Sequence, residues 1–247
     1  MTSIVEQLVW LAREVGRESL QLVVPGDGTV SASSAKDRLF VSPANVFLNR
    51  LESDAVAECD AGKLLELFDM PDSGAALLRQ SQVDPNRTAP GIDAVLHAWL
   101  LQLEGVHFVA QLNPVACLQV LCSPGGERFA GHRMFPGEVT AFGSQAVYVP
   151  YSDVGILLAR EVRSKVMLSQ RRNQGQVPRL VMIQNYGIIA MGPTAESVLR
   201  TALVAEKAAT VFVGSTRLGG PLFLAPQQVA RLESSSGNVP RASLIKP

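Results

Sequence analysis

Two short apolar runs with a tight connection between them dominate the C-terminal part of this 247-residue chain. The runs span 180–184 and 187–191, and the turn between them reads Asn185-Tyr186-Gly187. Runs of this length and spacing are typical of two neighbouring antiparallel strands. Thr194 follows as a good helix N-cap. The segment therefore predicts a strand pair and then a helix that ends near Val213.

The rest of the chain mixes helical and strand patterns irregularly. Apolar spacing predicts further helices over 3–16, 92–103, 115–121, 226–232 and from Ser152 or Asp153 to about Leu168. Further strands are expected over 29–31, 39–41, 106–112 and 146–149. A hairpin is expected over 55–68 around Cys59-Asp60-Ala61-Gly62, with loops over 70–90, 123–145 and 171–176. This order favours an α/β fold with a mixed, largely antiparallel sheet rather than a doubly wound parallel one.

Charge and hydropathy limit the classes of function. Acidic and basic residues balance at 22 each, so no electrostatic footprint for nucleic acid or an anionic membrane is expected. No run approaches the ~20 apolar residues of a membrane span, and the N-terminus does not resemble a signal peptide. The chain has three cysteines, Cys59, Cys117 and Cys122, and we expect them to be buried free thiols. We expect a cytoplasmic protein of one domain, 1–247, with a polar tail from about 233.

Four stretches, in order along nearly the whole chain, resemble the class II aldolase/adducin family. They are Gly28-Thr29-Val30-Ser31, the run 39–46, the run 89–98 with the strand 106–114, and the segment from Val149-Pro150-Tyr151 to the Asn185-Tyr186-Gly187 turn. The resemblance implies a three-layer α/β/α sandwich. It also implies a homo-oligomer, commonly a tetramer, with active sites near the subunit interfaces.

The residues that hold zinc in that family are replaced here. The family uses a His-x-His pair on a strand, whose alternate residues point the same way, and a third histidine in the hairpin turn. Gln111, Asn113 and Tyr186 occupy these positions. Amide oxygens are weak zinc ligands, and a phenol with a pKa of about 10 stays neutral. The sequence therefore predicts no zinc site and no cofactor. A carbonyl-lined site for a harder cation stays open as an alternative, with Asp93 as its one charged ligand.

The remaining positions of the family site are altered as well. Asp93 stands where the family has its acid/base glutamate, and an aspartate in a first helical turn is also favoured by the helix dipole. Thr29, Ser42 and nearby backbone N–H groups retain some capacity to bind an oxyanion, whereas Ile92 offers no side-chain donor. His97, in the middle of an apolar helix, is interpreted as a structural histidine.

Three functional hypotheses follow from this pattern. The first is a divergent, metal-free family member that binds a small polar, sugar-like ligand or serves only as structure. The second is a lyase with altered metal use, or an enzyme in which Asp93 and Tyr186 transfer protons on a carbonyl compound. The third is a scaffold, as in adducin heads. The candidate catalytic residues are Asp93 and Tyr186, and the candidate ligand-binding residues are Thr29, Ser42, Gln111, Asn113 and Asn185.

Overall fold

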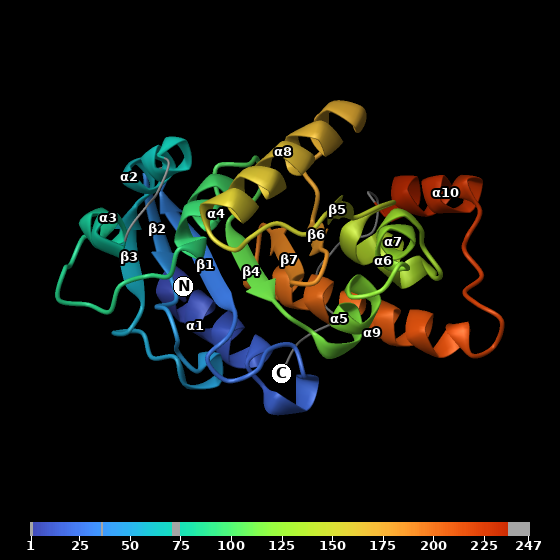
Figure 1. Ribbon diagram of the computed structural model, residues 1–247, viewed down its shortest axis with the longest axis horizontal. Helices are drawn as coiled ribbons and strands as arrows, with labels where there is room; N and C mark the ends of the chain where they lie inside the picture. The colour runs from blue at the N-terminus through green and yellow to red at the C-terminus, as the bar shows by residue number, and fades with distance from the viewer. Residues whose placement is uncertain (1, 36, 71–74, 237–247) are drawn as a thin grey trace.

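A mixed β-sheet runs through the centre of the computed structural model, which describes residues 2–35, 37–70 and 75–236. The strand order is β3-β2-β1-β4-β7-β6-β5 (Figure 1). The strands are β1 (Thr29–Ala35), β2 (Arg38–Val41), β3 (Ala57–Asp60), β4 (Phe108–Leu112), β5 (Val147–Val149), β6 (Leu180–Ile183) and β7 (Gly187–Gly192). Only the β5–β6 pair among these is parallel. The expected mixed, largely antiparallel sheet is confirmed.

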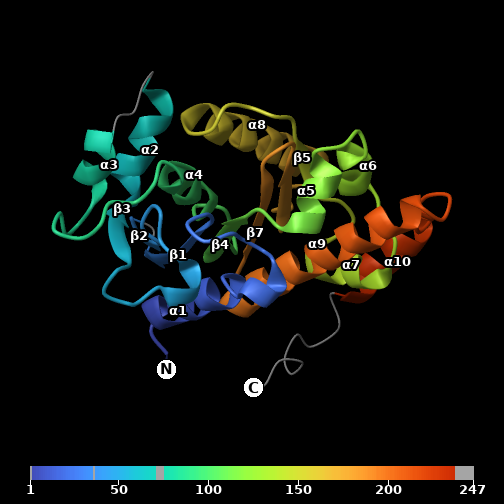
Figure 2. The same ribbon diagram turned by 60° about the horizontal axis from the view of Figure 1, so that its bottom comes forward.

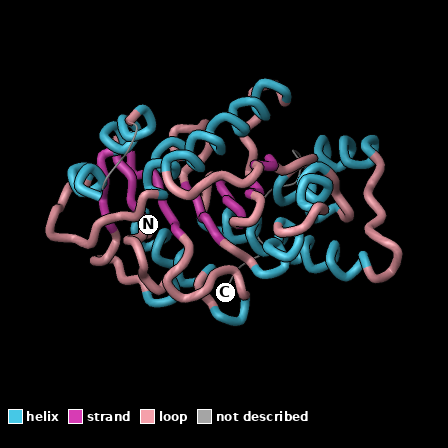
Figure 3. Tube along the Cα trace, viewed as in Figure 1, coloured by secondary structure: helices cyan, strands magenta, loops and turns pink. Residues whose placement is uncertain are grey.

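Helices cover both faces of this sheet (Figures 2 and 3). One face carries α1 (Ile4–Val15), α5 (Val115–Leu121) and α9 (Ala195–Thr216). The other face carries α2 (Ala61–Glu66), α4 (Asp93–Leu100) and α8 (Ile156–Arg172). The remaining helices are α3 (Ala75–Ser81), α6 (Gly126–Gly131), α7 (Pro136–Phe142) and α10 (Pro226–Ser236), with short 3-10 helices η1 (Glu18–Leu20), η2 (Leu48–Arg50) and η3 (Leu67–Asp69).

The central strands are buried on both faces, as a three-layer sandwich requires. Every residue of β4 and β7 is buried. Along β4, Val109 packs into the apolar layer under α4 and α8, whereas Ala110 packs into the layer under α1 and α9. Successive side chains of a strand point to opposite faces, so each central strand supplies both cores. The α/β/α architecture is thus confirmed.

The predicted hairpin forms between β6 and β7, where Ile183 pairs with Gly187. Asn185 adopts a left-handed conformation with φ 55°, and Gly187 has φ 148°. A Cβ atom at Gly187 would overlap the carbonyl oxygen of Leu112, so only glycine fits there. Thr194 caps α9 as expected, because its hydroxyl accepts a hydrogen bond of 3.1 Å from the Ser197 N–H.

Two predictions in the first half of the chain are wrong. The expected hairpin over 55–68 is instead β3 followed directly by α2. Asp60 acts as a helix N-cap, since its carboxylate accepts a hydrogen bond of 3.1 Å from the Lys63 N–H, and this cap outweighs the turn signal of Gly62. The expected loop over 70–90 contains α3.

Two predictions in the second half also need correction. The expected irregular segment 123–145 contains α6 and α7, and Pro136 begins α7 in the first-turn position that proline favours. Its Glu138 carboxylate accepts from the N–H groups of Met134 and Phe135 at 2.5 and 3.0 Å, which stabilises the helix start. Helix α8 begins after Gly155 rather than at Ser152 or Asp153, because the chain turns there with φ 96°.

The C-terminal end differs from the expected polar tail in one respect. Helix α10 continues to Ser236, past the expected start of the tail at about 233, and residues 237–247 lie outside the described part. In the described ranges, no helix combines the length and the apolar character that a membrane crossing needs.

Candidate functional site

One end of the sheet gathers most of the predicted site residues. Thr29 at the start of β1 pairs with Gln111 at the end of β4, so both side chains lie on the same face. The β6–β7 turn brings Tyr186 to this end, and the first turn of α4 brings Asp93. Figure 1 shows α4 crossing β1 and β4 on this face.

Gln111 lies at the centre of the cluster and is only 4% exposed. Its amide nitrogen donates a hydrogen bond of 2.8 Å to the hydroxyl oxygen of Tyr186. The same amide also interacts with the Asp93 carboxyl group. Gln111 therefore links the end of β4 to both candidate catalytic residues.

The two candidate catalytic residues lie in a poorly solvated environment. Burial raises the pKa of Asp93, and hydrogen bonds from Gln111 and Thr29 oppose this effect. The Thr29 hydroxyl lies 3.4 Å from an Asp93 carboxylate oxygen. Burial, followed by the nearby Asp93 carboxylate, raises the pKa of Tyr186 to about 12. At neutral pH the phenol is thus a neutral hydrogen-bond donor, not a phenolate.

His97 lies one turn after Asp93 on α4 and contacts the Gln111 side chain of this cluster. Its ring is fully buried, and its Nδ1 lies 2.7 Å from the Ser31 hydroxyl oxygen. Burial lowers the pKa of His97 to about 3, and a contact with the Gln111 side chain opposes this effect. Nε2 of His97 and Oε1 of Gln111 have no partner within hydrogen-bond distance. The ring is therefore neutral, in agreement with a structural histidine, and adjoins Gln111.

The rim of the cluster contains a contact that the sequence did not suggest. The Asn113 amide nitrogen donates a hydrogen bond of 2.8 Å to the carboxylate of Asp27. Asp27 is exposed and lies in the turn before β1. Its carboxylate also raises the pKa of Tyr186. The only sequence signal for Asp27 was its place in the turn Pro25-Gly26-Asp27-Gly28.

The other predicted residues have mainly backbone-supporting contacts. Ser42 is 1% exposed, and its hydroxyl accepts a hydrogen bond of 3.1 Å from the Val30 N–H. Asn185 contributes its left-handed backbone to the hairpin turn, and its N–H donates to the Leu121 carbonyl at 3.3 Å. Cys59 and Cys117 are buried as expected, whereas Cys122 is exposed, so the prediction of a buried thiol is wrong there.

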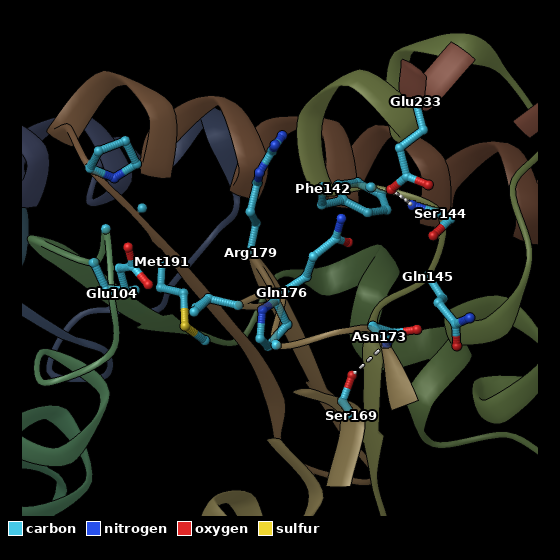
Figure 4. Close-up of a pocket in the computed structure, with 18 of the residues that line it drawn as sticks. Glu104, Phe142, Ser144, Gln145, Ser169, Asn173, Gln176, Arg179, Met191 and Glu233 are labelled. Atoms are coloured by element: carbon cyan, nitrogen blue, oxygen red, sulfur yellow. Dashed lines mark hydrogen bonds between the residues drawn. The ribbon is translucent and has the colours of Figure 1, made fainter. Parts of the chain in front are cut away.

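A cavity of about 570 Å³ lies at the opposite end of the same strands (Figure 4). It is lined by residues before β4, before β6 and after β7, and contains none of the predicted site residues. Its Arg179 donates to the Thr140 and Ala141 carbonyls at 3.1 and 3.4 Å, and its Glu233 accepts from the Ser144 N–H at 3.2 Å. These groups hold loops together, so we place the candidate site at the Gln111 cluster despite the size of this cavity.

A family model described as "Class II Aldolase and Adducin N-terminal domain" matches residues 6–213. The chain belongs to this family. Among curated protein sequences, none matches the chain.

Solved structures of low sequence identity share the class II aldolase fold. An L-fuculose 1-phosphate aldolase has a TM-score of 0.70 and 12% identity, with 95% of this chain and 97% of that chain covered. YgbL from Escherichia coli has a TM-score of 0.68 and 14% identity, with coverages of 93% and 97%. The N-terminal class II aldolase domain of a Thermoplasma acidophilum protein has a TM-score of 0.67 and 19% identity, with 86% of this chain and 95% of that chain covered. These similarities show the fold alone.

The residues present do not fit the zinc ion that the aldolase resemblance implies. The described residues contain no group of three or more His, Cys, Asp or Glu side chains placed to hold a metal ion. At the three positions that the resemblance assigns to zinc ligands, Gln111 and Tyr186 are hydrogen-bonded to each other, and Asn113 is bonded to Asp27. Amides and a neutral phenol are poor zinc ligands.

Proposed function

We propose that this class II aldolase family member does not cleave carbon–carbon bonds with zinc and instead binds a small polar, sugar-like ligand at the Gln111 cluster. The observation that carries the proposal is the 2.8 Å hydrogen bond between Gln111 and Tyr186. Two positions that would have to converge on a metal ion are occupied by groups that bond to each other.

The groups around this bond can recognise hydroxyl groups. Tyr186 accepts from Gln111, which leaves its own proton available for a ligand. Asp93 and Asp27 supply carboxylate oxygens near the same hydroxyl. A few convergent polar groups on a partly buried surface are what small polar ligands require.

The sugar-like character of the ligand is supported by the relatives. One solved structure of the same fold is an L-fuculose 1-phosphate aldolase, and another is a sugar-phosphate aldolase from Thermotoga maritima. From those names we carry over to this chain only the sugar-like nature of the ligand. By the same resemblance we propose a homo-oligomer.

Metal analysis and a cleavage assay test the proposal together. The purified protein is stripped with EDTA, dialysed against zinc, and assayed for bound metal and for cleavage of L-fuculose 1-phosphate. We expect no stoichiometric zinc and no cleavage. A variant with Gln111→His, Asn113→His and Tyr186→His serves as the positive control, since it restores three imidazoles, and we expect it to retain zinc. Stoichiometric zinc with cleavage in the unmodified protein would refute the proposal.

Binding is measured separately by saturation-transfer NMR with a panel of free sugars. We expect binding that Tyr186→Phe weakens, because the phenylalanine lacks the hydroxyl donor. Proton exchange at the carbon next to a sugar carbonyl, abolished by Asp93→Asn, would replace the binding proposal with a proton-transfer enzyme. If no sugar in the panel binds, a structural role replaces the binding proposal.

A further inference from the structure

Most side-chain donors of the candidate site already bond within the protein. The Gln111 amide nitrogen donates to Tyr186, and the Asn113 amide nitrogen donates to Asp27, both at 2.8 Å. The Thr29 hydroxyl donates to Asp93 at 3.4 Å. Each amide nitrogen carries two N–H groups, and the second one of Gln111 faces Asp93. The Tyr186 hydroxyl and the second N–H of Asn113 therefore remain as donors among these residues.

One acceptor, in contrast, remains without a partner. The Asn113 amide oxygen is buried and has no hydrogen-bond partner, whereas the amide oxygen of Gln111 adjoins the buried His97 ring. The orientation of the Asn113 amide follows from its neighbour, because the carboxylate of Asp27 can only accept, so the amide nitrogen must face it. A buried acceptor without a partner is costly, and a donor on a ligand would relieve that cost.

The charge of the site agrees with this imbalance. Asp27 and Asp93 both lie close enough to the Tyr186 hydroxyl to act on it electrostatically. The four ion pairs within the described ranges include neither carboxylate. Ser42 is a candidate donor for an oxyanion, but it is 1% exposed, and its burial keeps the hydroxyl away from a ligand.

From these contacts we infer that the site selects an unphosphorylated, donor-bearing sugar, either neutral or an amino sugar, and rejects phosphate esters. The inference rests on the function proposed above. Hydroxyl and ammonium groups supply the donors that Asn113 and the two aspartates can accept. A phosphate group at neutral pH offers acceptors and negative charge, which meet two carboxylates and few donors.

Paired ligands test the inference. Dissociation constants are measured by titration calorimetry at low salt for L-fuculose and L-fuculose 1-phosphate, and for D-glucosamine and D-glucosamine 6-phosphate. In each pair we expect the ester to bind about tenfold more weakly or worse, and the difference to shrink in high salt, since salt screens exposed charges. Equal or tighter binding of the esters would overturn the inference and leave the proposed sugar site intact. Absence of binding by all four compounds would overturn the proposed function itself.

A variant that removes one charge shows whether electrostatic repulsion or the shape of the site causes the discrimination against esters. Asp27→Asn removes one carboxylate at an exposed position, so the protein is expected to fold, which thermal unfolding verifies. We expect the variant to reduce the discrimination against esters severalfold. Asp54→Asn makes the same change of charge at an exposed turn next to β3, at the far edge of the sheet, and is expected to leave the discrimination unchanged. Equal discrimination in the two variants would contradict the role of Asp27.

Discussion

The amide nitrogen of Gln111 lies 2.8 Å from the hydroxyl oxygen of Tyr186 and joins the end of β4 to the β6–β7 turn. The two residues are 75 positions apart in the chain. Because Gln111 is nearly fully buried, either partner left alone loses a hydrogen bond that water replaces poorly. This contact therefore stabilises the site and holds the two side chains toward each other.

A double-mutant cycle measures the coupling between these residues. Tyr186→Phe and Gln111→Met should each lower the free energy of unfolding by about 1–2 kcal/mol, because each leaves one buried polar group unpaired. The double variant should lose less than the sum of the two, with a coupling of about 1 kcal/mol. Urea denaturation gives the four free energies. Strict additivity would mean that the contact contributes nothing.

Substitution by alanine should change the free energy of unfolding in opposite directions at Gly187 and Gly214. Gly187→Ala places a Cβ against the Leu112 carbonyl at a φ of 148°, and we expect a loss of roughly 3 kcal/mol or more. Gly214 lies exposed in α9 with open space around it, so Gly214→Ala should raise stability by about 0.5–1 kcal/mol. Thermal unfolding of both variants checks the two signs. A tolerated alanine at position 187 would show that the hairpin turn can move away from β4.

Glu206 on α9 caps the start of α5. Its carboxylate accepts hydrogen bonds of 2.9 and 3.0 Å from the N–H groups of Ala116 and Cys117. Glu206→Ala should cost about 1–2 kcal/mol of unfolding free energy, because both donors lose a charged acceptor. Glu206→Gln should cost less, since it keeps one acceptor. The exposed Glu196→Gln, at the start of α9, is the control and should change stability only slightly.

Stability should fall on acidification because of His97. Its pKa is about 3 in the folded protein and near 6.5 when exposed. The unfolded chain therefore binds a proton between these values and the folded one does not. The contribution of His97 is fully present above pH 6.5 and is lost as the pH falls toward 3, at up to about 1.4 kcal/mol per pH unit.

His97→Gln removes this titration while keeping a polar side chain near Ser31. Its unfolding free energy should change less than that of the unmodified protein between pH 6.5 and 4. Parallel pH curves for the two proteins would argue against a buried neutral imidazole.

Asp93 should have the opposite dependence on pH. Burial raises its pKa in the folded state above its ordinary value, so the folded protein holds the proton more tightly than the unfolded chain. That stabilising effect is present below the ordinary pKa and is lost as the pH rises through the folded pKa. Asp93→Asn should therefore raise stability at pH 7, and the gain should vanish at acid pH. A destabilised Asp93→Asn at pH 7 would show that the bonds with Thr29 and Gln111 outweigh burial.

Local patterns were sufficient for much of the fold. The hairpin of β6 and β7, the cap at Thr194 and the amphipathic helix α1 were predictable, because turn geometry, capping and apolar spacing act over a few residues. The segment 55–68 was misjudged since Asp60 can serve either a turn or a helix cap. The choice between them depends on how α2 packs against α4.

The sequence by itself indicated an aldolase-like fold and placed Gln111, Asn113 and Tyr186 where the resemblance expects imidazoles. Only the tertiary structure decided what the replacements do. Gln111 bonds to Tyr186, and Asn113 bonds to Asp27 across 86 positions of chain. The physical reason is that these hydrogen-bond partners come together only where strand ends and turns meet at one end of the sheet. Residues that are far apart in the sequence meet there, so local sequence patterns do not reveal the pairs.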